Sequence, residues 1–254
     1  DYLLAEVLQQ QTEEMQTFLL HTSILDRLCG PLCEALLPEM AISGQNFLEQ
    51  LEQSNLFLIP LDQQRHWYRY HHLFGDLLYQ RLQQKYANQK EKLMELHLQA
   101  STWLEENEFY LEAFRHAAAS NDMPRVIRVI GEERIPQHFR GNATTLLNWF
   151  QTLPKETLDV YPWVWWRYAS LKLLTGDSVD VVEQLDAAEA GLPTIELEDE
   201  RRLLIGNIAT ARATHALSHY DVATMEIQAK RALEYLPPSS AVTRGVAYWV
   251  LGYS

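Results

Sequence analysis

Between residues 55 and 82 the spacing of apolar side chains changes twice. A short apolar run from Leu56 to Leu61 predicts a strand, and the polar residues 62–64 that follow predict a turn. His66 to Tyr70 alternate aromatic with polar side chains, as a half-buried return strand does. From His71 onward apolar residues recur at helical spacing, so this segment predicts a two-stranded hairpin followed by a helix.

Apolar stripes at helical spacing also precede the hairpin. One predicted helix carries Met15 and Phe18, a second begins at Pro31, and a third runs from Gly44 to about Ser54. A shorter stripe from Tyr2 to Leu8 comes before them. Helices that lead into a hairpin predict a winged helix domain, which we place over residues 1–88.

Residues 89–254 show helical patterns without a strand signal, and the pattern repeats. Gly176 and Tyr220 each follow a predicted helix, and each lies seventeen residues before a Leu-Pro pair that contains Pro193 or Pro237. Gly141 and Glu108 mark two earlier units, at steps close to the 34-residue tetratricopeptide period. The longer step from Gly176 to Tyr220 predicts an insertion around residues 191–199.

Small residues recur where the paired helices of such a repeat approach each other. We expect close helix packing at Ala113, Ala169, Ala188, Ala213, Ala232 and Gly252. The final segment YWVLGYS looks like the middle of a further first helix, so we expect a helical repeat domain over 89–254 that is truncated at its C-terminus. The predicted fold class is mainly α, with a small winged helix domain and a tetratricopeptide-like superhelix.

The charge balance argues against DNA binding by the winged helix. The chain carries a net charge of −13, and residues 1–87 hold 11 acidic and 5 basic side chains, an excess of six negative charges. The predicted helix before the hairpin contains Glu49 and Glu52 but no Lys or Arg, whereas a DNA-reading helix supplies cations to phosphates. We therefore interpret this domain as a module for protein and interdomain contacts.

Several phrases resemble one known family. RYHHLF after the hairpin, with FLLHTSILDRLCGPLCEAL and FLEQLEQSNLFLIPLD before it, is similar to the winged helix of the large ATP-dependent LuxR-type transcription regulators, the MalT-like signalling ATPases. The resemblance implies an ATPase domain before Asp1, a LuxR-type helix-turn-helix after Ser254, and ATP or ADP as cofactor of the full-length protein. The repeats depart from the family at Glu108, where Gly is usual, and at Arg134, which replaces a small residue.

The resemblance also implies a role for His71. In the related ATPases a Met-His-Asp motif follows the hairpin, and its His reaches the bound ADP; here His71 and His72 occupy the last two of those places. An imidazole at a helix N-terminus can donate to a phosphate oxygen. The alternative is that His71 caps the wing against Asp76 or the backbone and contacts no ligand.

Aromatic and hydroxyl side chains suggest an inducer site. In tetratricopeptide register, one concave column mixes flat rings with polar groups that could orient a small molecule or a protein segment. Its members are Trp163, Trp166, Ser170, Asn207, Thr210, Thr214, Trp249 and Tyr253. The alternative is ordinary packing, and the same register makes Trp165 and Trp149 core residues.

We expect no catalysis by this chain. It lacks the phosphate-loop motif G-x-x-x-x-G-K-[ST], and the carboxylates of Glu105, Glu106 and Glu108 lie in a segment typical of a solvated turn. Cys29 and Cys33 suit buried free thiols better than a disulfide framework or a metal site. With no membrane-spanning run, these features predict a cytoplasmic protein.

Two functions from different classes fit these features. The first is the central fragment of a LuxR-type regulator, which relays inducer sensing to its own ATPase domain and has no direct contact with DNA or membrane. The second is a stand-alone tetratricopeptide-like adaptor that binds a protein segment and has no link to transcription.

Overall fold

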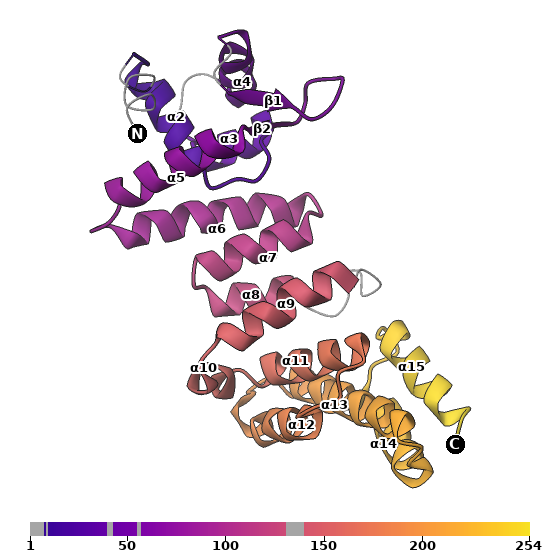
Figure 1. Cartoon of the computed structure of the whole chain (residues 1–254). Helices are drawn as coiled ribbons and strands as arrows, with labels where there is room; N and C mark the ends of the chain where they lie inside the picture. Colours follow the sequence, from indigo (N-terminus) through magenta and orange to yellow (C-terminus); the bar gives the residue numbers. More distant parts are fainter. Residues whose placement is uncertain (1–7, 9, 40–42, 55–56, 131–139) are drawn as a thin grey trace. The chain divides into compact units, whose positions relative to one another are not determined.

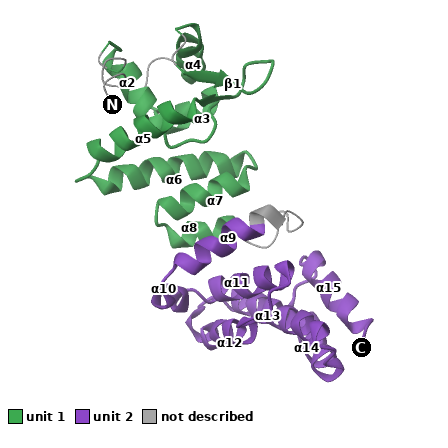
Figure 2. Cartoon of the chain, viewed as in Figure 1, with its two compact units in different colours: residues 1–135 green, residues 136–254 purple. Residues whose placement is uncertain are grey.

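The computed structural model describes residues 8, 10–39, 43–54, 57–130 and 140–254. The chain divides into two compact units, residues 1–135 and 136–254 (Figure 2). In the described residues helices dominate, and the strands form a single two-stranded sheet (Figure 1), which confirms the mainly α prediction. No helix in these residues is both long and apolar enough to cross a membrane.

The N-terminal three-helix core follows the predicted apolar stripes. Its helices are α2 (Glu13–Thr22), α3 (Gly30–Leu36) and α4 (Gly44–Gln53). Thr12 and Ser43 cap α2 and α4 by accepting hydrogen bonds from backbone N–H groups, and Pro31 occupies the first turn of α3. The rings of Phe18 and Phe47 stack in the core at a centroid distance of 4.8 Å. Most of the predicted stripe from Tyr2 to Leu8 lies outside the described residues.

The predicted hairpin is present. Strands β1 (Leu58–Pro60) and β2 (Tyr68–Tyr70) are antiparallel, with Leu58 opposite Tyr70. The Asp62 carboxylate accepts hydrogen bonds from the backbone N–H groups of His66 and Trp67, at 3.1 and 2.7 Å, and so closes the loop. Tyr68 and Tyr70 both point into the core, which explains the aromatic alternation seen in the sequence.

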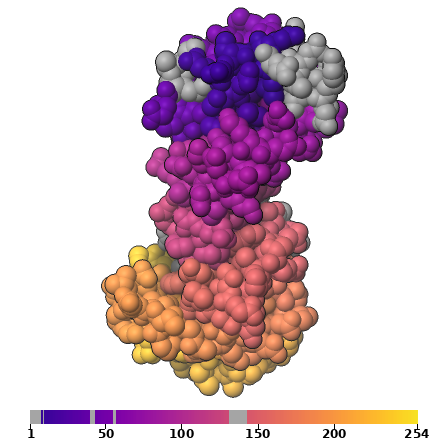
Figure 3. Space-filling model, turned by 90° about the vertical axis from the view of Figure 1, so that its left-hand side faces the viewer, coloured from indigo at the N-terminus to yellow at the C-terminus, as the bar shows by residue number. Residues whose placement is uncertain are grey.

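Four further helices complete the first unit. They are α5 (His72–Lys85), α6 (Lys90–Glu106), α7 (Tyr110–Ala119) and α8 (Met123–Val129). Helix α6 packs against α3 of the winged helix as well as against α7. In the space-filling view the purple winged helix runs without interruption into the magenta helices (Figure 3). The predicted boundary after residue 88 thus lies inside one compact unit, and it stays a prediction about where the repeat begins.

The second unit consists of helical hairpins. Its elements are α9 (Arg140–Thr152), α10 (Lys155–Val160), α11 (Pro162–Thr175), α12 (Val181–Ala190), the 3-10 turn η1 (Leu192–Thr194), α13 (Glu198–Ser218), α14 (Val222–Tyr235) and α15 (Ala241–Leu251). The first helices of successive hairpins lie side by side, because α13 packs against both α11 and α15. Helices α12 and α14 pair with α11 and α13 within their hairpins.

Three of the residues that mark the predicted repeat lie at helix C-terminal ends with the same backbone conformation. Glu108, Gly176 and Tyr220 each adopt a left-handed backbone conformation, with φ of 67°, 80° and 56°. In each case the next N–H bonds back to a carbonyl five residues earlier: Phe109 to Leu104, Asp177 to Lys172 and Asp221 to Ala216. This pair of features defines the Schellman motif, so the three positions are structurally equivalent.

Two details of the predicted repeat are wrong, and a third position cannot be compared. Gly141 lies in the first turn of α9 and not, as predicted, after the C-terminal end of a helix. Arg134, which belongs to the same predicted unit, lies outside the described residues. Helix α15 ends at Leu251, so YWVLGYS does not continue as a helix to Ser254. The predicted insertion is confirmed as η1 together with a longer first helix: α13 has 21 residues, whereas α11 has 14.

Close packing at small residues is confirmed in both units. The side chains of Ala113, Ala169, Ala188, Ala213 and Ala232 are all fully buried. Gly252 is exposed beyond the end of α15, so the expectation for that position is wrong. Cys29 and Cys33 are buried free thiols, and burial raises the pKa of each.

Candidate functional site

His71 stands where the hairpin meets α5. Its backbone N–H donates to the carbonyl of Phe57 at 2.7 Å, and its carbonyl accepts from Phe74 and Gly75 at 2.9 Å each. The imidazole makes no hydrogen bond with any described residue, Asp76 included, and lies against the ring of His72 at a centroid distance of 4.4 Å. The backbone of His71 therefore fixes the wing to the helix, while its side chain is left available.

The helix that a DNA reader would place in the major groove is acidic here. Glu49 and Glu52 lie on α4, and Arg65 at the wing is held by Glu52 with an Nε–Oε1 distance of 3.2 Å. Gln45 donates to the Glu49 carboxylate and to the Arg65 carbonyl, which ties the wing to α4. The surface of α4 thus offers no uncompensated positive charge to a phosphate backbone.

Trp166 in α11 does not lie where the predicted register places it. Trp166, expected on an open concave face, is 6% exposed and packs in the core with Ala169, Leu185 and Ile208. Trp165, expected in the core, is partly buried against the same cluster, and its indole N–H donates to Asp159 at 2.9 Å. One residue turns a helix by about 100°. Because α11 is apolar on nearly every side, its sequence period could not tell which tryptophan faces inward.

Trp163 also belongs to the packed side of α11. It is partly buried against the same cluster, and its ring meets that of Trp166 edge to face at 5.7 Å. At the other end of the unit, Trp249 and Tyr253 are 53% and 64% exposed and lie 5.1 Å apart between ring centroids. The predicted aromatic column is therefore divided between a core pair and an exposed pair.

The polar members of the predicted column are held tightly to their own helices. The hydroxyls of Ser170, Thr210 and Thr214 each donate to the carbonyl four residues earlier, at 2.9 Å. Thr210 is buried, and Ser170 and Thr214 are partly buried. Their hydroxyl donors are used within the helix, so these residues offer oxygen lone pairs rather than donors to a ligand.

Asn207 is the unusual member of this group. Its side chain is 1% exposed, and neither its amide oxygen nor its amide nitrogen has a hydrogen-bond partner. It lies on α13, one turn before Thr210 and two before Thr214. A buried amide without partners is costly, and a ligand that both donates and accepts would satisfy it. The sequence indicated this position through the register of the predicted concave column.

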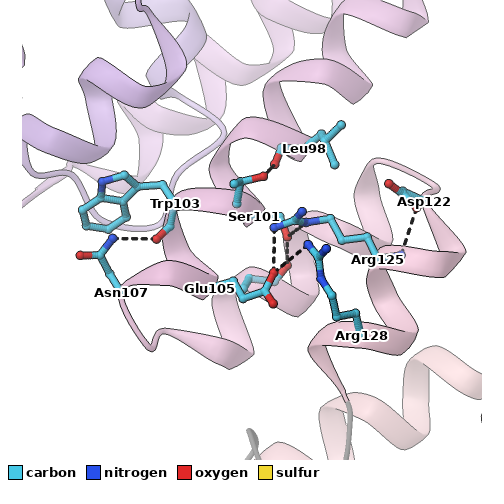
Figure 4. Close-up of polar contacts among 10 residues, drawn as sticks. Leu98, Ser101, Trp103, Glu105, Asn107, Asp122, Arg125 and Arg128 are labelled. Atoms are coloured by element: carbon cyan, nitrogen blue, oxygen red, sulfur yellow. Dashed lines mark hydrogen bonds and ion pairs between the residues drawn. The ribbon is translucent and has the colours of Figure 1, made fainter. Parts of the chain in front are cut away.

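Sequence reasoning missed a buried ionic cluster in the first unit (Figure 4). The Arg125 guanidinium bonds Ser101 at 2.7 Å and the Glu105 carboxylate at 3.0 Å, and Arg128 reaches the same carboxylate at 3.1 Å. The side chains of Glu105 and Arg125 are only 9% and 8% exposed. The interpretation of Glu105 as part of a solvated turn is therefore wrong, because α8 folds back over the end of α6.

A buried histidine pair joins α6 to α7. The Nδ1 atoms of His97 and His116 lie 2.9 Å apart, and both side chains are buried. Burial lowers the pKa of His97 to about 4 and that of His116 to about 3, so the pair is neutral at physiological pH. Both histidines lie on the buried sides of their helices, so the helical spacing of apolar residues around them could have predicted their burial.

Comparison with known proteins supports the assignment made from the hairpin and its helices. Residues 4–90 match the family described as the MalT winged helix domain. The chain is 33% identical over 154 residues to the serine/threonine-protein kinase PknK of Mycobacterium tuberculosis, which is 61% of this chain and 13% of that protein. It is 32% identical over 164 residues to the HTH-type transcriptional regulator MalT of Vibrio campbellii, which is 64% of this chain and 17% of that protein.

A second MalT, from Vibrio parahaemolyticus, is 31% identical over 163 residues and is likewise covered to 17% of its length. The chain thus spans only a small part of the relatives that it matches. The match to the domain family includes the three-helix core, the hairpin and α5. Residues 4–90 therefore match the MalT winged helix domain family in sequence, and the described residues of this range have the helices and the hairpin of a winged helix.

Proposed function

We propose that this chain is the central, relaying part of a MalT-like transcription regulator of the LuxR type. In this proposal the helical hairpins bind an inducer, and the winged helix passes the signal to an ATPase domain and a DNA-binding domain that lie elsewhere in the regulator. The match of residues 4–90 to the MalT winged helix domain carries the proposal. The length of the relatives, of which this chain covers 13–17%, supports a role as one part of a larger protein.

The winged helix acts in this scheme through protein contacts. Its α4 is acidic and its wing cation is already paired with Glu52, so it is poorly suited to grip DNA. Similarity to both a transcriptional regulator and a protein kinase fits the same idea, since a module that relays conformation can serve different output domains.

His71 is the proposed contact to the nucleotide. Its backbone is fixed by the hairpin and α5, and its ring makes no hydrogen bond to any described residue. A hydrogen bond from this imidazole to an ADP phosphate would hold the ATPase domain against the winged helix in the resting state. Release of that bond would accompany exchange to ATP.

The inducer site is proposed on the first helices of the second unit. Asn207 supplies an amide with no internal partner, and Ser170, Thr210 and Thr214 supply hydroxyl oxygens. Trp163 borders the core, and the exposed Trp249 and Tyr253 provide stacking area at the far helix. Trp166 is removed from the set because it is part of the core.

The proposal is tested with the complete reading frame that encodes this chain. We expect a G-x-x-x-x-G-K-[ST] motif upstream of Asp1, and we expect the intact protein to bind ADP. Deletion of the gene should abolish expression of a small set of transcripts, and the intact gene should restore them. A reading frame without a phosphate loop, or an unchanged transcript profile, would instead favour the tetratricopeptide-like adaptor.

A further inference from the structure

A cavity of about 730 Å³ lies within the first unit, between α2, the end of α3 and α6. Binding sites for small ligands fall in the range of about 300 to 1,000 Å³. Leu36, Leu37 and Leu96 line this cavity with apolar surface, and Tyr86 closes one side. The cavity is therefore large enough for an extended side chain together with its apolar neighbours.

The rim of the cavity is negatively charged. Glu13, Glu14, Glu39 and Glu95 line it, and none of these four carboxylates forms an ion pair with a described residue. Lys92 is the cation among the lining residues, and its Nζ lies 5.8 Å from the centre of the Tyr86 ring. Lys85 lies beside the lining as well, with its Nζ 5.7 Å from the centre of the Tyr86 ring, so four carboxylates face two ammonium groups, an excess of two negative charges.

Two polar side chains in the lining also lack part of their hydrogen bonding. His21 bonds the Tyr86 hydroxyl through Nε2 at 2.8 Å, but its Nδ1 is buried without a partner. The amide oxygen of Gln99 is likewise shielded and unpaired. The torsion about the Cγ–Cδ bond of glutamine is broad and roughly two-fold, so the Gln99 amide can turn to meet a donor placed in the cavity. The lining thus needs hydrogen-bond donors and positive charge.

We propose that this cavity receives the arginine side chain of a peptide segment, whose apolar neighbours rest on Leu36, Leu37 and Leu96. A guanidinium group carries five N–H donors and a charge that is never lost, so it can serve several carboxylates and the Gln99 oxygen at once. The cavity exceeds the size of a guanidinium group several times over, which leaves room for the flanking residues of the segment. This site involves neither His71 nor the inducer face, so it is independent of the proposed function.

The test uses the full chain and arrayed eight-residue peptides. Each peptide has one central arginine and varied apolar neighbours, and each is paired with a counterpart in which citrulline, of the same shape but uncharged, replaces arginine. We expect saturable binding of a subset of arginine peptides, measured by fluorescence anisotropy, and at least a tenfold loss with citrulline. Equal binding of the two series, or no binding by any arginine peptide, would overturn the proposal.

Matched variants then locate the site. Glu95→Gln removes a rim charge on α6, whereas Glu91→Gln removes an exposed charge on the same helix outside the lining. We expect Glu95→Gln to weaken peptide binding roughly 2- to 5-fold and Glu14→Gln/Glu95→Gln further, with no change for Glu91→Gln. Equal losses for Glu91→Gln and Glu95→Gln would show general attraction to an acidic chain and would overturn the assignment.

Gln99→Leu distinguishes binding from folding. Replacing an unpaired buried acceptor by an apolar group is close to neutral for stability or favourable. We expect an unchanged or raised melting temperature together with severalfold weaker peptide binding. Benzamidine carries a similar planar cation without a peptide, so its affinity is compared with that of the best peptide. If benzamidine bound as tightly, the peptide segment would be the wrong occupant.

Discussion

At the scale of single residues, the buried and unpaired side-chain amide of Asn207 should destabilise the fold. A buried polar group without a hydrogen bond destabilises a protein by about 1 to 3 kcal/mol. Asn207→Leu keeps a similar size and removes the unpaired amide, so we predict a rise of about 1 to 2 kcal/mol in the free energy of unfolding, measured by chemical denaturation. In the intact regulator the same variant should lose its response to inducer. A destabilised Asn207→Leu would show that the amide has a partner after all.

Trp165 and Trp166 offer a second test in one helix. Trp166 lies in the core, so Trp166→Ala should destabilise the second unit by about 3 to 5 kcal/mol. Trp165 is only partly buried against the same cluster, so Trp165→Ala should cost less, even though it also loses the hydrogen bond to Asp159. Thermal melting of the two variants side by side measures the difference. Equal losses would mean that both rings carry the packing of α11.

His71 tests the proposed nucleotide contact in the intact regulator. If the imidazole holds the ADP form, His71→Ala removes a hydrogen bond to a charged group, which contributes about 1.5 to 3 kcal/mol. The active fraction should then rise roughly 10- to 100-fold, seen as transcription without inducer. His72→Ala is the matched control, since its exposed ring neighbours His71. Unchanged basal transcription and ADP affinity in His71→Ala would leave the side chain without a role in the switch.

At the scale of elements, two of the three equivalent helix ends can be made more stable. Glu108 and Tyr220 hold a left-handed conformation that costs residues other than glycine about 1 to 2 kcal/mol, whereas Gly176 holds it freely. We predict that Glu108→Gly and Tyr220→Gly each stabilise the chain by about 0.5 to 1 kcal/mol. Glu226→Gly in the middle of α14 should instead destabilise it by about 1 kcal/mol. If Glu108→Gly and Tyr220→Gly destabilised the chain as Glu226→Gly does, residues 108 and 220 would not hold the left-handed conformation.

The elements themselves were largely predictable, and the reasons are local. The hairpin, its turn at Asp62 and the caps at Thr12 and Ser43 follow from short-range chemistry that a sequence displays directly. Spacing also indicated the repeat, because Gly176 and Tyr220 each mark a helix end seventeen residues before a Leu-Pro pair. Gly141 misled the same search, since glycine is equally compatible with the first turn of a helix.

The candidate sites were harder to predict, because they depend on how elements meet. The partners of Glu105 come from α8, twenty residues further along the chain, so its burial cannot be read from its own acidic segment. The side of α11 that faces inward is decided by α12 and α13 and not by its own almost uniformly apolar sequence. The roles proposed for Asn207 and His71 as ligand-binding residues stay predictions.

At the scale of the molecule, stability should depend on pH through the buried pair His97 and His116. Burial lowers both pKa values below the ordinary 6.5, to about 4 and about 3, so between pH 6.5 and about 4 the unfolded chain binds protons that the folded chain does not. Stability should therefore fall as the pH drops through this window, by about 1.4 kcal/mol per pH unit for each proton. Hydrogen exchange of amides in α6 and α7 at pH 7, 6 and 5 measures this unit separately. His116→Gln should flatten the dependence, and an unaltered slope would assign it to other groups.

The last prediction is that the chain neither binds duplex DNA nor hydrolyses ATP. A net charge of −13 repels a polyanion, and the helix that would enter the groove carries Glu49 and Glu52 beside an already paired Arg65. Fluorescence anisotropy with a labelled duplex should show no complex at about 0.15 M salt, where surface charges further apart than about 8 Å are screened. Without a phosphate loop the chain should also release no phosphate from ATP. A sub-micromolar, salt-sensitive DNA complex would show that cations placed outside α4 and the wing make a binding surface, and the winged helix would then have to be treated as a DNA reader.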